Sequence, residues 1–172
     1  MEDIESYGER TQSSLLYMLL SQQARPGLLD HSASHLGKAM AIIGFLRSAH
    51  PLVRLGHDPG IPMELLAAKG ISQEGLKSVD VWKSEELRWI VHRMATRAME
   101  HLEMAEKHSV DQTSPLKPMI ILVRRYLSKL QSINFDLSDP RLYQRDGLLP
   151  ISLAWYIWRG TKGKSQQEGS LQ

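Results

Sequence analysis

Apolar residues recur at spacings of three and four through most of the chain, and no alternating run is long enough to predict a strand. The strongest signal is the segment 39–46, which is apolar on every side of a helical wheel. A helix of that kind is buried all round by other helices. Asp30 and Ser32 are suitable N-caps for it, and Pro51 is expected to stop it just after Ser48.

The segment that follows is polar and contains several Gly and Pro residues, so residues 50–60 are predicted to form a loop. Pro62 then stands near the first position of a short helix, where Pro is well tolerated. A second short helix is expected to begin at Ile71.

One-sided apolar stripes predict four further helices, over residues 2–23, 83–109, 115–134 and 148–159. The stripe of the first consists of Ile4, Tyr7, Thr11, Leu15, Met18 and Leu19. The stripe of the second consists of Leu87, Ile90, Val91, Met94, Ala98, Leu102 and Ala105. His92, His101 and His108 lie around the wheel of this second helix, and they are expected to be solvated or to cap it.

These elements predict an all-α helical bundle, and a chain of 172 residues fits a single domain. Residues 160–172 contain one large apolar residue, Leu171, and are expected to be a disordered tail.

Composition leaves the fold prediction unchanged but excludes several kinds of site and partner. With 42% hydrophobic and 23% charged residues, the chain is typical of a folded domain. A net charge of +2 and the lack of a basic stripe with interleaved aromatics argue against a nucleic-acid partner. The chain has no Cys, which excludes disulfides, thiolate zinc sites and cysteine nucleophiles.

His31 and His35 have the four-residue spacing with which a helix can hold a metal ion. No Glu follows the first of them, as the zinc-protease pattern requires, and no third ligand is evident nearby. Hydrogen-bonded structural histidines are therefore favoured, and the sequence predicts neither a metal nor a cofactor.

No stretch predicts a membrane-spanning helix, because the apolar segment 148–158 has about half of the roughly 20 residues that a span needs. The sequence begins with Met-Glu-Asp-Ile-Glu, whereas a mitochondrial presequence is rich in Arg and poor in acids, so these residues are not expected to be a transit peptide.

The order of parts after residue 30 is similar to that of a known family. A buried helix ending in Leu46-Arg47, a polar loop, Pro62 and the segment 70–74 resemble the region of the second aspartate motif in the squalene/phytoene synthase family. A non-catalytic branch, the mitochondrial complex I assembly factor 6 proteins, is more similar still. This second resemblance is carried by residues 7–17, 30–39, 70–74, 148–150 and 158–159.

The resemblance implies the type I isoprenoid synthase fold, of which this chain looks like the C-terminal half. Residues 1–159 would then form a partial squalene/phytoene synthase-like domain. Family members are longer, so the sequence is interpreted as a fragment, a shortened isoform or an incomplete gene model.

The resemblance also indicates a former site for Mg²⁺ and diphosphate. In the family enzymes, carboxylates four residues apart on one helix face help to hold Mg²⁺. The matching positions here are Ser48 and Leu52, beside Pro51, and neither supplies a carboxylate. Arg47 is retained; it could bind a phosphate or lipid headgroup, but hydrogen bonding to the last carbonyls of its helix is favoured. We therefore expect a vestigial face with no catalytic residue.

The last predicted helix offers a second candidate surface. Trp155, Trp158 and Arg159 suggest an aromatic and basic edge suited to a membrane interface or a partner. The alternative, which is favoured, is that these aromatics pack into the bundle.

The resemblance implies a non-catalytic assembly factor for mitochondrial respiratory complex I. Its partners would be complex I subunits or assembly intermediates, on the matrix side of the inner membrane and with peripheral membrane contact. Two alternatives stay open: an isoprenoid synthase of the phytoene or squalene type with a remodelled site, and a protein that binds prenyl groups or lipids.

Overall fold

A computed structural model of the chain describes residues 1–21, 27, 29–108, 114–144, 147, 150–151 and 153–155, apart from the side chain of His108. Helices joined by turns make up this part of the chain, and none of its residues lies in a strand. The prediction of an all-α bundle is confirmed.

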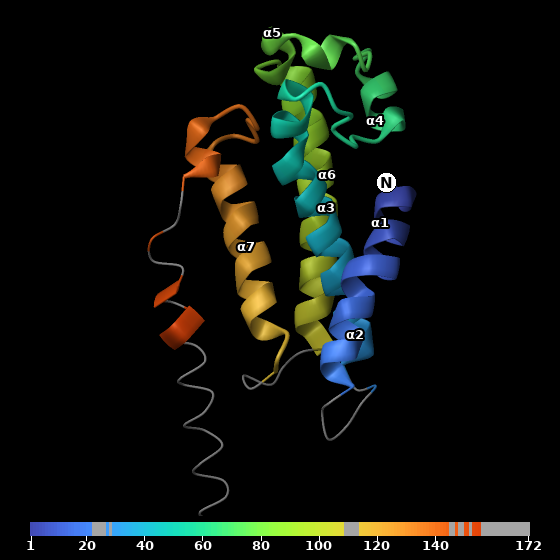
Figure 1. Cartoon of the computed structure of the whole chain (residues 1–172), viewed down its shortest axis with the longest axis vertical. Coiled ribbons are helices and arrows are strands. Elements are labelled where there is room, and N and C mark those ends of the chain that lie inside the picture. Colours follow the sequence, from blue (N-terminus) through green and yellow to red (C-terminus); the bar gives the residue numbers. More distant parts are fainter. Residues whose placement is uncertain are drawn as a thin grey trace, which may run out of the picture.

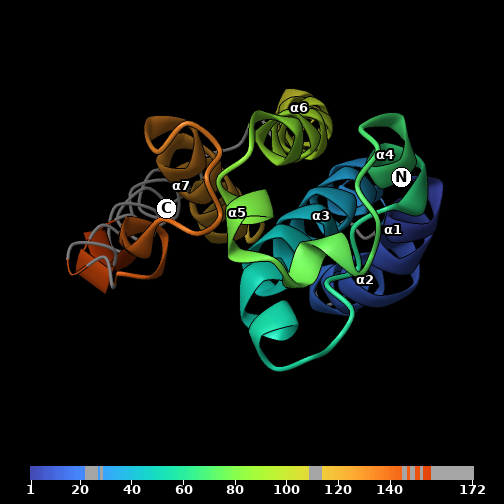
Figure 2. The ribbon, with the colours of Figure 1, turned by 90° about the horizontal axis from the view of Figure 1, so that it is seen from above.

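Two long antiparallel helices form the centre of the bundle, α3 (Asp30–Arg54) and α6 (Glu85–His108) (Figure 1). The apolar stripe predicted for residues 83–109 is buried in its entirety along α6. The helix α7 (Lys117–Ser132) and the N-terminal helix lie on opposite sides of α3 (Figure 2). The four buried residues of α7 are Ile120, Val123, Leu127 and Leu130.

The N-terminal helix changes its winding part of the way along. It consists of α1 (Glu2–Gly8), the π-helical segment η1 (Glu9–Ser13) and α2 (Ser14–Leu20), and the backbone stays helical at both junctions. We call residues 2–20 the first helix. Its buried residues are Ile4, Gly8, Ser13, Leu16 and Leu20.

The predicted inner face of the first helix is therefore wrong beyond Ile4. Leu15 and Met18, expected in the core, are 62% and 69% exposed. A π-helical turn contains more than four residues, so the inward positions 8 and 13 are five apart. This one wide turn rotates every later side chain relative to a regular α-helix.

Pro51 does not stop α3, contrary to the sequence prediction. It lies in the last turn of α3, and the helix ends three residues after it, at Arg54, in a Schellman motif. The amide of Gly56 donates to the Val53 carbonyl (2.9 Å), and that of His57 donates to the Leu52 carbonyl (2.9 Å). Gly56 takes the left-handed conformation that this motif requires, with φ of +79°.

Nor is α3 buried all round. Gly44, in the middle of its apolar segment, is exposed, and a Cβ built there would meet nothing within 4 Å.

Short elements close one end of the central pair: α4 (Met63–Ala68), the 3-10 turn η2 (Gly75–Lys77) and α5 (Val79–Trp82) (Figure 1). Pro62 is the N-cap of α4, which confirms the predicted short helix. The second short helix, expected from Ile71, forms instead as η2 and α5. Trp82 anchors this end through its indole N–H, which donates to the buried Leu76 carbonyl (2.6 Å).

After α7, the chain makes one further 3-10 helix, η3 (Pro140–Tyr143), capped by Asp139. Residues 150–151 and 153–155 are helical, and the rest of the predicted helix 148–159 and the tail 160–172 lie outside the described residues. No helix in the described part is both long and apolar enough to cross a membrane.

Candidate functional site

Two glycines bring the first helix unusually close to α3. A Cβ built on Gly37 of α3 would lie 2.5 Å from the backbone nitrogen of Ser13. On the facing helix, a Cβ on Gly8 would lie 2.9 Å from Cβ of Ala41. This approach brings acidic side chains of the first helix against polar residues of α3 and α6.

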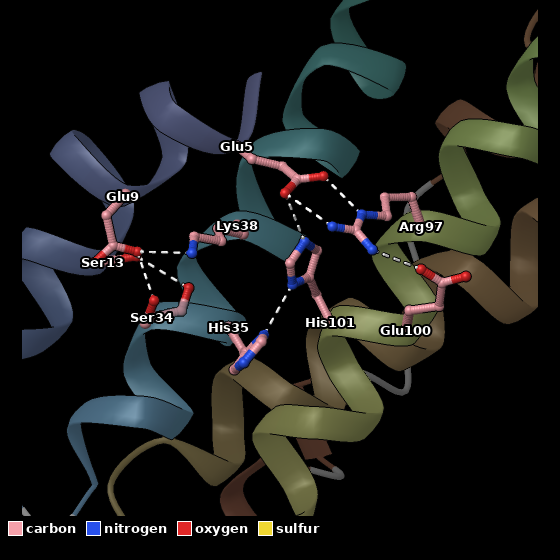
Figure 3. Close-up of polar contacts among 9 residues, drawn as sticks. All are labelled: Glu5, Glu9, Ser13, Ser34, His35, Lys38, Arg97, Glu100 and His101. Atoms are coloured by element: carbon pink, nitrogen blue, oxygen red, sulfur yellow. Dashed lines mark hydrogen bonds and ion pairs between the residues drawn. The ribbon is translucent and has the colours of Figure 1, made fainter. Parts of the chain in front are cut away.

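The first group of polar contacts is centred on Glu9, at the start of the π-helical segment (Figure 3). Its carboxylate accepts hydrogen bonds from the hydroxyls of Tyr17 (2.6 Å), Ser34 (2.6 Å) and Ser13 (3.3 Å). Lys38 Nζ lies 3.5 Å from the same carboxylate. Burial raises the pKa of Glu9, but the Ser34 and Tyr17 hydroxyls and the charge of Lys38 outweigh it and lower that pKa overall.

The second group is centred on Glu5, one helical turn earlier. Arg97 of α6 donates two hydrogen bonds to the Glu5 carboxylate, from Nε (2.7 Å) and Nη2 (3.1 Å), and its Nη1 donates to Glu100 (2.9 Å). The hydrogen bonds from Arg97 lower the pKa of Glu5 despite its partial burial. Glu5 and Glu100 together raise the pKa of Arg97, so the guanidinium stays charged.

His101 extends this second group into the interface between α3 and α6. The residue is 5% exposed, so the expectation of a solvated or capping histidine is wrong for it. Its Nδ1 lies 2.9 Å from Nδ1 of His35, and its Nε2 lies 3.3 Å from Oε2 of Glu5. The contact with Glu5 is close enough for an ion pair, but it is too poorly aligned to be a hydrogen bond.

The surroundings of His101 favour one arrangement of the protons on the two rings. If His101 carried its proton on Nδ1, the lone pair of its Nε2 would face the Glu5 carboxylate. The favourable neutral arrangement has His35 Nδ1–H donating to His101 Nδ1, with His101 Nε2–H facing Glu5. Glu5, His101 and His35 thus form a continuous line from the first helix through α6 to α3 (Figure 3).

One end of this line reaches solvent. A hollow of about 500 Å³ lies between the first helix, α4 and α6. Glu5, Arg97 and Glu100 are among its lining residues, together with Arg93 and Thr96.

The contact of His35 agrees with the hydrogen-bonded role that the sequence analysis favoured over a metal site. Its partner His101 is 66 positions away, on another helix. Across the described residues, no group of three or more His, Asp or Glu side chains is arranged to hold a metal ion.

The residues predicted as a vestigial diphosphate face lie elsewhere on α3. Arg47 is twelve positions from His35, which corresponds to about 18 Å along a helix. Arg47 and Pro51 are exposed, whereas Ser48 and Leu52 are half-buried. The Ser48 hydroxyl donates to the carbonyls of Gly44 (3.0 Å) and Phe45 (3.2 Å).

These residues do not fit Mg²⁺, the ion implied by the isoprenoid synthase resemblance. Mg²⁺ is held by carboxylate oxygens, whereas the Leu52 side chain has no oxygen and the Ser48 hydroxyl is already bonded to its own helix. A guanidinium at position 47 adds repulsion for a cation.

The third predicted surface is described only in part. Trp155 is 56% exposed, so at most part of its side chain packs against the bundle. Trp158 and Arg159 lie outside the described residues.

Sequence reasoning missed the polar network, although two signals point to it. Glu5, Glu9 and Ser13 recur every four residues, which places a polar line along one helix face. His101 comes seven positions after Met94 and four before Ala105, both in the predicted stripe, so the helical period puts it at the edge of the buried face.

Comparison with known proteins gives a consistent picture. The profile of the squalene/phytoene synthase family matches residues 1–147. The chain is similar to the protein of Bos taurus called NADH dehydrogenase (ubiquinone) complex I, assembly factor 6, with 35% identity over 167 residues, or 92% of this chain and 48% of the relative. The Homo sapiens protein of that name is 33% identical over 167 residues, with 94% and 49% covered.

The homolog of that protein in Drosophila melanogaster is 37% identical over 163 residues, or 90% of this chain and 47% of the relative. The chain thus spans about half the length of the curated relatives it matches. No solved structure gives a significant match.

Proposed function

The chain belongs to the squalene/phytoene synthase family, and we propose that it is a non-catalytic member that acts in the assembly of mitochondrial respiratory complex I. The observation that carries the proposal is the similarity, over nine-tenths of the chain, to relatives that bear the name of a complex I assembly factor. Residues 1–159 would form the family domain, as the C-terminal half of its fold.

The non-catalytic part of the proposal rests on the α3 residues Arg47, Ser48, Pro51 and Leu52. Catalysis in this family would require Mg²⁺ to neutralise a departing diphosphate, and carboxylates to hold the metal. The side chains at those four positions include no carboxylate, and that of Leu52 has no atom that could bind a metal. This face is therefore a vestige of the catalytic one in our proposal, and no cofactor is expected.

The partners would be complex I subunits or assembly intermediates, on the matrix side of the mitochondrial inner membrane. Trp155, Trp158 and Arg159 would provide peripheral contact with the membrane or with a partner. The assignment is supported by the partial exposure of Trp155, which leaves 56% of its surface uncovered in this chain.

Complex I abundance tests the assembly role. Cells that lack this gene would be complemented with the 172-residue chain targeted to mitochondria, and complex I would be resolved on a native gel. We expect complex I to fall without the gene and to recover with the chain. Unchanged complex I in the deletion would overturn the proposed role. Recovery with a full-length relative but not with this chain would show that these 172 residues are not sufficient for assembly.

The non-catalytic role has a separate test with the purified chain. We expect no Mg²⁺-dependent release of pyrophosphate from prenyl diphosphates, and detectable turnover would favour the alternative of a remodelled isoprenoid synthase. Prenyl or lipid binding, the other alternative, would appear as co-purified lipid in native mass spectrometry.

A further inference from the structure

The contact between His35 and His101 depends on how many protons the two rings hold. With both rings neutral, one Nδ1–H donates across the 2.9 Å gap and the facing Nδ1 accepts. The bond needs only that one of the two facing Nδ1 atoms carries a hydrogen and the other does not, so it is compatible with a single imidazolium in the pair.

A second additional proton cannot be accommodated in the same geometry. Both rings would then carry Nδ1–H, and two donors with like charge would face each other at 2.9 Å. The rings would have to separate, and because they belong to α3 and α6, the two central helices would lose their polar contact at this level.

The charges around His101 come from three helices. Glu5 of the first helix favours the imidazolium, whereas Arg97 of α6 and Lys38 of α3 disfavour it. Burial is the largest influence, and it lowers the pKa of His101 below the ordinary histidine value. A lowered pKa in the folded state means that the unfolded chain binds more protons, so stability is lost as the pH falls below about 6.5.

Glu5, at one end of this line, is open to solvent. Glu5 lines the hollow between the first helix, α4 and α6, and it contacts both Arg97 and His101. The Glu5 carboxylate that Arg97 holds lies 3.3 Å from His101 Nε2, on the side of the first helix.

We propose that Glu5, His101 and His35 form a proton-sensitive lock between α3 and α6, closed at neutral pH and opened when both histidines become imidazolium. Opening separates the start of α3 from the end of α6 and leaves the far end of the pair, around Trp82, closed. The pKa of Glu9 is lowered, so its carboxylate stays charged in the same pH range and the group of polar contacts centred on it does not open with the lock.

Hydrogen exchange of the intact chain tests the lock. After correction for intrinsic exchange rates, we expect the protection factors of the amides in residues 31–38 and 98–105 to be at least ten times lower at pH 5 than at pH 7.5. His101→Gln and His35→Gln should abolish most of this pH dependence. The matched control is His57→Gln, an exposed histidine in the loop after α3, which should leave it unchanged.

A second measurement does not require the variants to fold. Imidazole ¹⁵N spectra of the wild-type chain should show His101 protonated on Nε2 at pH 7.5. The two rings should take up their additional protons in two steps at least one pH unit apart. Titration of both rings in one step, or exchange in residues 31–38 and 98–105 that does not change with pH, would overturn the proposal.

Discussion

The close approach of the first helix and α3 predicts that one glycine of α3 cannot be replaced without a loss of stability. In Gly37→Ala, the new Cβ would lie 2.2 Å from Oγ and 2.5 Å from the backbone nitrogen of Ser13. The hydroxyl could rotate away, but the backbone nitrogen could not. The two helices would have to move apart by close to 1 Å, which is the shortfall from an ordinary van der Waals contact.

The expected cost combines three contributions. Overpacking of a close contact typically costs about 1–3 kcal/mol. Separation of the helices also weakens the hydrogen bond from the Ser13 hydroxyl to the Ser34 carbonyl (3.1 Å), which contributes about 1 kcal/mol. Alanine is favoured over glycine inside a helix by about 1 kcal/mol, which offsets part of the loss. The net destabilisation should be about 1–3 kcal/mol, or about 2–12 °C in the midpoint of thermal unfolding.

The same helix contains its own control. In Gly44→Ala, the new Cβ meets nothing within 4 Å, so only the gain in helix propensity remains. This variant should be more stable than the parent chain by about 0.5–1 kcal/mol. Urea unfolding followed by circular dichroism gives the free energy of unfolding of all three proteins.

The two substitutions are chemically identical and lie on one helix, so propensity alone predicts equal effects. A stability of Gly37→Ala equal to or above that of Gly44→Ala would refute the close packing described here. A large loss in both would instead show that α3 is covered on its Gly44 side as well.

Three further substitutions test other parts of the structure by the same unfolding assay. Glu9→Ala should cost about 2 kcal/mol because the Ser34 and Tyr17 hydroxyls lose their acceptor, and the loss should be smaller in a Tyr17→Phe background. Pro51→Ala should stabilise the chain by about 1 kcal/mol or more, since it removes a proline from within α3; a loss of stability would indicate that the helix ends before it. Gly56→Ala should cost about 1 kcal/mol because of the left-handed backbone there, and no change would contradict the Schellman motif.

The fold class and the most regular helix could be predicted from the sequence alone. The stripe of α6 is buried as expected, because a straight helix with one partner face follows the 3.6-residue period over its whole length. The family resemblance was equally readable, because it depends on the order of short motifs rather than on any side-chain contact.

The end of α3 could not be predicted because two signals compete there. Pro51 removes one backbone donor, which predicts a stop, but a single missing bond in the last turn does not outweigh the packing of the helix. The actual end is set by Gly56, whose left-handed conformation permits the two closing hydrogen bonds. Gly and Pro are both helix-ending signals, and the sequence does not rank them.

The polar network was hidden for a different reason. The His35–His101 contact joins residues 66 apart, and periodicity within one helix does not report which helices become neighbours. A histidine at the edge of a buried face is solvated or enclosed according to what packs beside it. Here the first helix supplies Glu5 and Arg97 closes the side, so the ring is enclosed.

The register of the first helix follows from the same contacts. A regular α-helix would bury Thr11 and Leu15 after Tyr7, as the apolar pattern suggests. That register would place a side chain larger than Ser13 against Gly37, where even a single Cβ on the glycine has no room. The wide π-helical turn brings the small Ser13 to this position instead and directs Glu9 to the hydroxyls and to Lys38. Exposure of Leu15 is therefore the cost of a close, polar contact between the first helix and α3.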